Sequence, residues 1–257
     1  MKMTRLFTTI FDPELKARGF KRKGRVYARL KGEILQGITI KPINPYSIHF
    51  VAFPYWIEHP DGPARRWFPY NKGYWAEGSG DWCINAPSEA YYREENEERN
   101  YDFMSSFYEL AAQYILPEMD KIDNLDAYLG CYTKPWQTEE RNTRNPWVFE
   151  AKVEKLDKYL PGGDRRISLY WPYRTIGHQY AYLYKAYLDG SFDNAYKQFI
   201  KQFDDNIEAF FKYPHNEDFR AQMEKNNLNW IIDFKEEHRK IVLPMLREEL
   251  GLDTFGL

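Results

Sequence analysis

The residues from Leu15 to Trp56 constrain the fold more than any other stretch of this chain. They contain a helix end, a basic turn and three strand-like runs, at residues 25–30, 33–40 and 46–56. The runs are separated by short turns at Lys31-Gly32 and Asn44-Pro45. Because turns this short join antiparallel neighbours, the pattern predicts a β-meander.

An amphipathic helix is predicted directly before the meander. Its apolar residues recur at helical spacing and are Leu6, Phe7, Ile10, Phe11 and Leu15. Pro13 is expected to loosen this helix, with Asp12 capping a second short turn, and Gly19 is placed to end it. A meander with one apolar face needs a cover, and this helix is the nearest candidate.

The alternation within the runs predicts which residues share a face of the sheet. Ile34, Gln36, Ile38 and Ile40 fall on one face of their run. In the third run Ile48, Phe50 and Ala52 fall on one side, and His49, Val51 and Phe53 fall on the other.

The rest of the chain predicts one further strand and several helices. A strand is expected at 81–85, a helix from Tyr101 that stops or kinks at Pro117, and a short helix capped by Asn124. Residues 134–145 read as a linker, and a mainly helical region begins with a helix from Asn145 to Leu160. The prediction is therefore an α+β protein with an α+β domain at 1–133, a linker at 134–145 and a helical region at 146–257 packed on the first domain.

One block of the meander resembles a known family. The block runs Gly19-Phe20-Lys21-Arg22-Lys23-Gly24-Arg25-Val26-Tyr27 and is followed by the strand-like runs at 34–40 and 49–56. It resembles the bacterial family called domain of unknown function 4304, over roughly residues 5–130. The resemblance implies an α+β domain and brings no catalytic residues.

Charge is unevenly distributed in a chain that is almost neutral overall. The net charge is -2, which argues against nucleic acid as a partner. Residues 1–41 nevertheless hold eleven basic and three acidic residues, whereas residues 89–126 hold eleven acidic and three basic ones. The two regions either face each other or are solvated, and the alternative is a basic face that meets an anionic partner.

The sequence also carries predictions about compartment and cofactors. The apolar run at residues 6–11 is too short for a signal peptide, no run is long enough to span a membrane, and Cys83 and Cys131 are the only cysteines. This predicts a cytoplasmic protein without a membrane partner. The sequence contains no phosphate-binding loop and no glycine motif for a dinucleotide, so no cofactor is predicted. It also contains no pair of His or Cys residues at the spacing of metal ligands, so no metal is predicted.

The predicted binding site is the segment rich in aromatic residues and arginine, together with His49 from the sheet. Aromatic residues make up 18% of the chain, and Trp, Tyr and Arg dominate binding hot spots. We therefore predict a non-enzymatic intracellular binding protein whose partner is a macromolecule, with a protein as the candidate. The predicted binding residues are His49, Tyr55, Trp56, Arg65, Arg66, Trp67, Tyr70, Trp75 and Trp82. The plainer interpretation is a loop that packs its own aromatic side chains onto the sheet.

Two alternative functions remain open from the sequence. The first is a hydrolase-type enzyme with a nonstandard site drawn from His49, His59, Asp81 and Cys83, whose side chains would then converge. The second is a sugar-binding module, which would need exposed, coplanar rings among Trp67, Trp75 and Trp82. The sequence carries no prediction of the oligomeric state.

Overall fold

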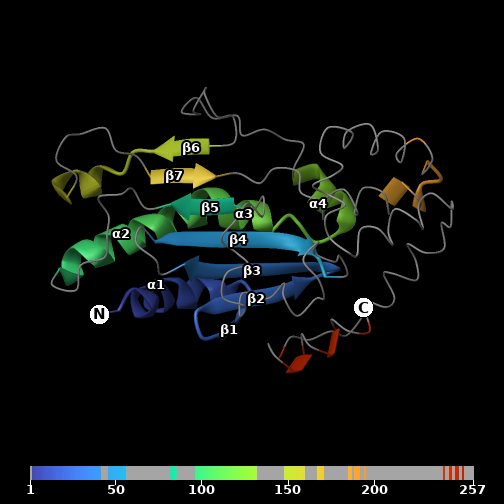
Figure 1. Cartoon of the computed structure of the whole chain (residues 1–257), viewed down its shortest axis with the longest axis horizontal. Helices are drawn as coiled ribbons and strands as arrows, with labels where there is room; N and C mark the ends of the chain where they lie inside the picture. The colour runs from blue at the N-terminus through green and yellow to red at the C-terminus, as the bar shows by residue number, and fades with distance from the viewer. Residues whose placement is uncertain are drawn as a thin grey trace, which may run out of the picture.

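A computed structural model shows an α+β protein built on one antiparallel sheet (Figure 1). It describes residues 2–41, 46–55, 82–85, 96–131, 148–159 and 167–170, with short pieces at 185–186, 188–191, 194, 240, 243–244, 247–248 and 251. The predicted fold class, with an N-terminal helix and an antiparallel meander, is confirmed. The predicted helices after residue 171 lie almost wholly outside the described residues.

Within the described residues the sheet has seven strands, in the order β1-β2-β3-β4-β5-β7-β6. Every neighbouring pair is antiparallel. Their bounds are β1 Lys21–Lys23, β2 Val26–Lys31, β3 Ile34–Lys41, β4 Ser47–Pro54, β5 Trp82–Asn85, β6 Val148–Ala151 and β7 Ile167–Tyr170. The first four strands follow one another in space as in the chain, which is the predicted meander.

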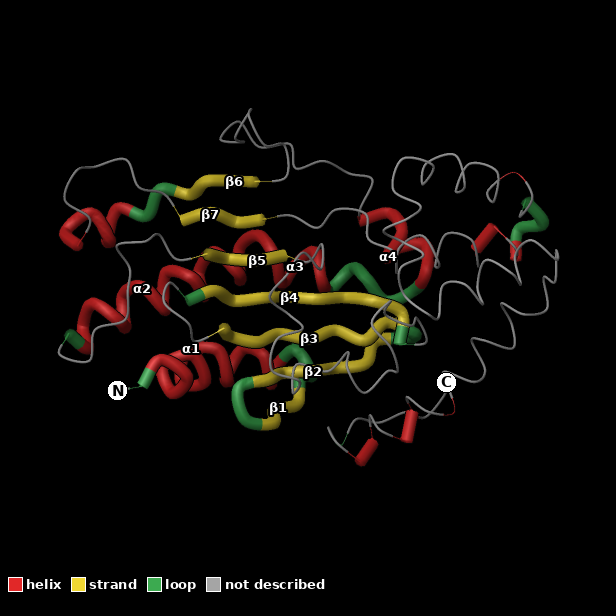
Figure 2. Tube along the Cα trace, viewed as in Figure 1, coloured by secondary structure: helices red, strands yellow, loops and turns green. Residues whose placement is uncertain are grey.

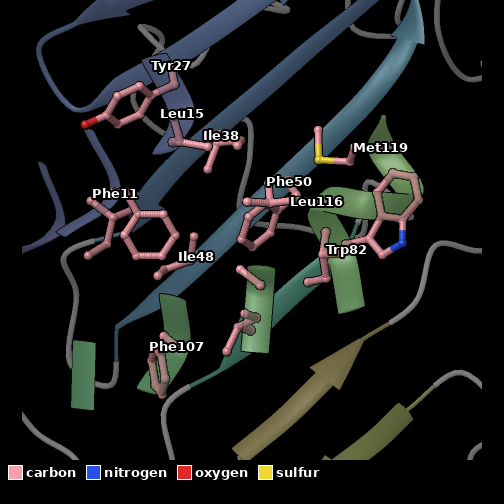
Figure 3. Close-up of a cluster of buried hydrophobic side chains, with 14 of the residues drawn as sticks. Phe11, Leu15, Tyr27, Ile38, Ile48, Phe50, Trp82, Phe107, Leu116 and Met119 are labelled. Carbon is pink, nitrogen blue, oxygen red and sulfur yellow. The ribbon is translucent and has the colours of Figure 1, made fainter. Parts of the chain in front are cut away.

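Helices α1, α2 and α3 lie behind the sheet, as Figure 2 shows. The helical elements are α1 Met3–Ala17, α2 Glu97–Leu110, the π-helical turn η4 Ala111–Ile115, α3 Leu116–Met119 and α4 Leu125–Cys131, with the 3-10 helix η5 Glu154–Tyr159 after β6. Figure 3 shows apolar side chains from α1, α2 and α3 meeting those of the central strands. Phe11, Ile48, Phe50, Trp82 and Phe107 in this layer are all fully buried.

Two predictions about helix ends differ from the structure. Pro13 lies inside a continuous α1, because the carbonyl it leaves without a donor belongs to Thr9, which is exposed to water. Pro117 does not stop the helix that begins with α2, because the π-helical turn η4 shifts the hydrogen-bond register just before it and the chain continues as α3. The alternative outcome, a kink at Pro117, stays a prediction. By contrast, Gly19 ends α1 as predicted, with a φ of 84°.

The prediction of a helix from Asn145 to Leu160 is wrong. Residues 148–151 form β6, which pairs with β7 at residues 167–170. These strands extend the sheet of the predicted first domain beyond the predicted linker. The run Trp147-Val148-Phe149 favours a strand once β7 offers backbone partners, and that long-range pairing overrides the local Asn-Pro helix start. The boundary at 134–145 lies in residues outside those described.

A buried polar network joins α1, the β2–β3 hairpin and the end of α3. Arg29 donates from Nε and Nη2 to Gln36 Oε1 at 2.9 and 2.7 Å, and from Nη2 to Asp120 Oδ1 at 2.5 Å. Gln36, which has no exposed surface, donates to the carbonyl oxygens of Met119 and Ile122 at 2.7 Å each. Arg18 completes the network through an ion pair with Asp120. Together these bonds hold the end of α3 to the sheet.

The network partly confirms that the basic first segment faces the acidic one. Arg18 and Arg29 pair with Asp120, which belongs to the acidic stretch. Other acidic residues of that stretch form ion pairs with lysines of η5 instead. Lys155 Nζ lies 2.6 Å from Glu109 Oε1, and Lys158 Nζ lies 3.0 Å from Asp102 Oδ2. The basic strand β1 remains exposed along its length.

Two buried tyrosines allow a matched test of hydroxyl pairing. Tyr27 donates its hydroxyl to Asp12 Oδ1 at 2.9 Å, whereas the buried Tyr46 hydroxyl makes no hydrogen bond within the described part of the chain. A buried polar group without a partner costs free energy, and removing it relieves that cost. We therefore expect Tyr46→Phe to raise the free energy of unfolding by about 0.5–1.5 kcal/mol and Tyr27→Phe to lower it by about 1 kcal/mol.

Urea denaturation followed by circular dichroism measures both changes. The two variants lose the same hydroxyl from the same residue type, so each serves as the control for the other. Equal destabilisation by both would show that Tyr46 is hydrogen-bonded.

Candidate functional site

The described residues bring a histidine, a serine and a cysteine together on the face of the sheet opposite the helices. His49 on β4 is the cross-strand partner of Cys83 on β5, and Ser47 lies two residues before it on the same face. Ser47 Oγ lies 2.8 Å from His49 Nε2, and Cys83 Sγ lies 3.9 Å from the same nitrogen. Ser47 is buried, while His49 and Cys83 are half-buried.

The environment of His49 keeps its imidazole neutral. Burial and, as a smaller contribution, the positive charge of Lys41 together lower the pKa of His49 to about 4. Lys41 is the cross-strand partner of Ser47. At neutral pH the ring therefore carries one proton and offers one nitrogen as a hydrogen-bond acceptor.

A neutral imidazole beside a hydroxyl and a thiol has the composition of a nucleophile–base pair. The Ser47–His49 distance is within ordinary hydrogen-bond range, and the Cys83–His49 distance is longer but within reach of a small side-chain rotation. Within the described residues Cys83 takes part in no disulfide. Among the described residues no group of three or more His, Cys, Asp or Glu side chains could hold a metal ion.

The predicted binding residues are only partly described. His49 lies on the sheet face just discussed. Tyr55 is 4% exposed and Trp82 is fully buried, so neither lines an exposed face, contrary to the prediction. Trp82 follows the alternation that directs Phe50 and Ile48 towards the helices, since Phe50 is its cross-strand partner.

The other predicted site residues lie outside the described part of the chain. They are Trp56, Arg65, Arg66, Trp67, Tyr70 and Trp75 of the binding segment, and His59 and Asp81 of the hydrolase alternative. Of that alternative, the structure brings His49 and Cys83 together and leaves the other two undescribed.

Ser47 is the residue that the sequence analysis missed. The signal was present, because a serine two residues before a strand histidine shares its face. Ser47 becomes a candidate site residue only in the structure, where β5 places Cys83 near the same His49 nitrogen that Ser47 contacts.

Comparison with known proteins returned no match among family models, curated proteins or solved structures. The resemblance to the domain of unknown function 4304 family therefore stays a prediction. No helix in the described residues is both long and apolar enough to cross a bilayer. The fold class is α+β.

Proposed function

We propose that this chain is a cytoplasmic binding protein for a protein partner, with the residues between β4 and β5 as its contact segment. The segment carries Trp56, Arg65, Arg66, Trp67, Tyr70 and Trp75. These are the residue types that dominate protein interfaces.

The observation that carries this proposal is the length of the connection between two adjacent antiparallel strands. β4 ends at Pro54 and β5 begins at Trp82, yet the two strands pair directly, Phe50 with Trp82. Adjacent antiparallel strands need a turn of only about 2–5 residues. A long connection mounted on a rigid sheet is a common location for binding residues.

Tyr55 and Trp82 take a different role in this proposal from the predicted one. Both are buried in the core at the two ends of the connection. The backbone N–H of Tyr55 also donates to the Glu33 carbonyl at 3.0 Å. They therefore anchor the contact segment, and the contact residues lie between them.

The sugar-binding alternative is less well supported. Stacking on a sugar requires exposed rings, and Trp82 has no exposed surface. The arginine pair Arg65-Arg66 is better suited to a protein surface, where arginine joins aromatic residues at the centre of interfaces.

Affinity capture with a charge-reversal variant tests the proposal. The wild-type protein, immobilised and exposed to an extract of the cells that produce it, should retain a partner that mass spectrometry identifies. Arg65→Glu/Arg66→Glu should weaken binding of that purified partner at least tenfold by calorimetry, because each hot-spot truncation costs about 2 kcal/mol or more.

The matched control is Lys21→Glu/Lys23→Glu, the same charge change on the exposed strand β1. It should leave the dissociation constant within about twofold, since exposed charges outside an interface contribute little. Retention of no partner, or equal losses in both variants, would contradict the proposal.

A further inference from the structure

We propose that Cys83 is the nucleophile of an acyl-transfer site, with His49 as its general base and Ser47 as a positioning residue. This site lies on the sheet, whereas the proposed protein-binding segment lies in the β4–β5 connection. The inference is therefore independent of that proposed function.

The sheet register brings the nucleophile and the base together. Cross-strand partners in an antiparallel pair have Cβ atoms only about 4.5–5.5 Å apart, so His49 and Cys83 are held face to face by backbone pairing. Because both reside on paired strands, their separation does not depend on a loop. The 3.9 Å between Sγ and Nε2 needs only a small approach for proton transfer.

Ser47 determines which imidazole nitrogen acts as the base. Its hydroxyl is 2.8 Å from Nε2, and a hydroxyl that donates there favours the tautomer with the proton on Nδ1. In this tautomer Nε2 is the acceptor, and it is also the nitrogen nearest to Cys83. Because Nε2 has a single lone pair, the Ser47 hydroxyl turns away as this nitrogen accepts the thiol proton, and its oxygen then accepts from the new Nε2–H.

The reaction needs only an ester, water and the side chains of the site. The thiol of Cys83 attacks the carbonyl carbon of an ester, its proton moves to His49 Nε2, and collapse of the tetrahedral adduct expels the alcohol, which takes that proton. Water then attacks the S-acyl group while His49 accepts its proton, and the proton returns to the sulfur as the carboxylic acid leaves. No oxidant, metal or cofactor enters this balance.

The surrounding charge indicates the substrate class. Lys41 occupies the register position opposite Ser47 at the end of β3 and adds positive charge beside His49. We therefore assign the site to small acyl esters that carry a carboxylate on the acyl group, because a cation at this position attracts the anionic end.

The experiment uses the full chain with Cys131→Ala, which leaves Cys83 as the single thiol. The probes are 4-nitrophenyl succinate, which is anionic, and 4-nitrophenyl acetate, which is neutral. We expect one acyl group on Cys83 by intact mass and peptide mapping. We also expect catalytic release of nitrophenol at least tenfold faster with the succinate ester than with the acetate, after the protein-free rate of each ester is subtracted, because the succinate ester also cleaves through its own carboxylate.

Variants then separate the roles of the four side chains. Cys83→Ala should abolish acylation, and His49→Gln should slow it about 100-fold. Lys41→Met should slow only the succinate reaction. Ser47→Ala should slow acylation several-fold. Ser47→Thr should restore the rate, because threonine also carries a hydroxyl; if Ser47 acted only through packing, the larger threonine would not restore it.

Thermal unfolding of each variant establishes that it is folded before its rate is compared. Acylation on lysine instead of Cys83, equal rates for wild type and folded His49→Gln, or loss of turnover in Ser47→Ala with full turnover in Cys83→Ala would each overturn the proposal. The last result would make Ser47 the nucleophile.

Discussion

Gln36→Met is expected to lower the free energy of unfolding by about 3–5 kcal/mol. Gln36 is fully buried and makes four hydrogen bonds, two from Arg29 and two to the carbonyl oxygens of Met119 and Ile122. Methionine conserves the length of the side chain but can neither accept from the guanidinium nor donate to the carbonyls. Arg29, itself 8% exposed, then keeps a buried charge with fewer acceptors.

Urea denaturation monitored by circular dichroism measures this loss. The matched control is Gln113→Met, the same chemical change at an exposed position in η4, which should alter stability by no more than about 0.5 kcal/mol. A cost for Gln36→Met below about 1 kcal/mol would mean that the network does not hold α3 to the sheet.

Gly32→Ala is expected to destabilise the fold by about 3–5 kcal/mol, for a different reason. Gly32 forms the β2–β3 turn with a φ of 55°, where a residue with a side chain is strained. A Cβ built there would lie 2.0 Å from the carbonyl oxygen of Asp123, so the backbone after α3 would have to move. The turn and that backbone therefore pack without room for a methyl group.

Gly24→Ala separates the two contributions to this cost. Gly24 has a similar φ of 60°, but a Cβ there would meet nothing within 4 Å. Its alanine variant should lose only about 1–2 kcal/mol, the cost of the left-handed conformation. Thermal and urea unfolding of both variants provide the comparison. Equal costs at the two positions would show that the contact with Asp123 is not tight.

The local parts of this fold could be read from the sequence because they depend on neighbours in the chain. Gly19 and Asn124 end and begin helices through their own backbone or side chain, and the alternation around Phe50 and His49 correctly separates the two faces of β4. The residues 145–160 could not be read in the same way. Their strand β6 exists because β7 supplies its hydrogen-bond partners.

The candidate site likewise depends partly on residue type, which the sequence shows, and partly on strand pairing, which it does not. The sequence nominated His49 and Cys83 by residue type, but their approach depends on the pairing of β4 with β5, which are separated by a long connection. The sequence also nominated Trp82 for an exposed face. The same register turned that side chain towards the helices, because cross-strand partners share a face and Phe50 lies in the core.

The sequence by itself determined the α+β class, the helix ends at Gly19 and Asn124 and the alternation of the meander, since periodicity and turn chemistry act over a few residues. Only the tertiary structure decided which basic residues form ion pairs with Asp120, which aromatic side chains are buried, and which side chains surround His49. These outcomes depend on the register between strands and helices far apart in the chain. A shift of one residue in the β4–β5 pairing would exchange Cys83 for Trp82 on the face of His49.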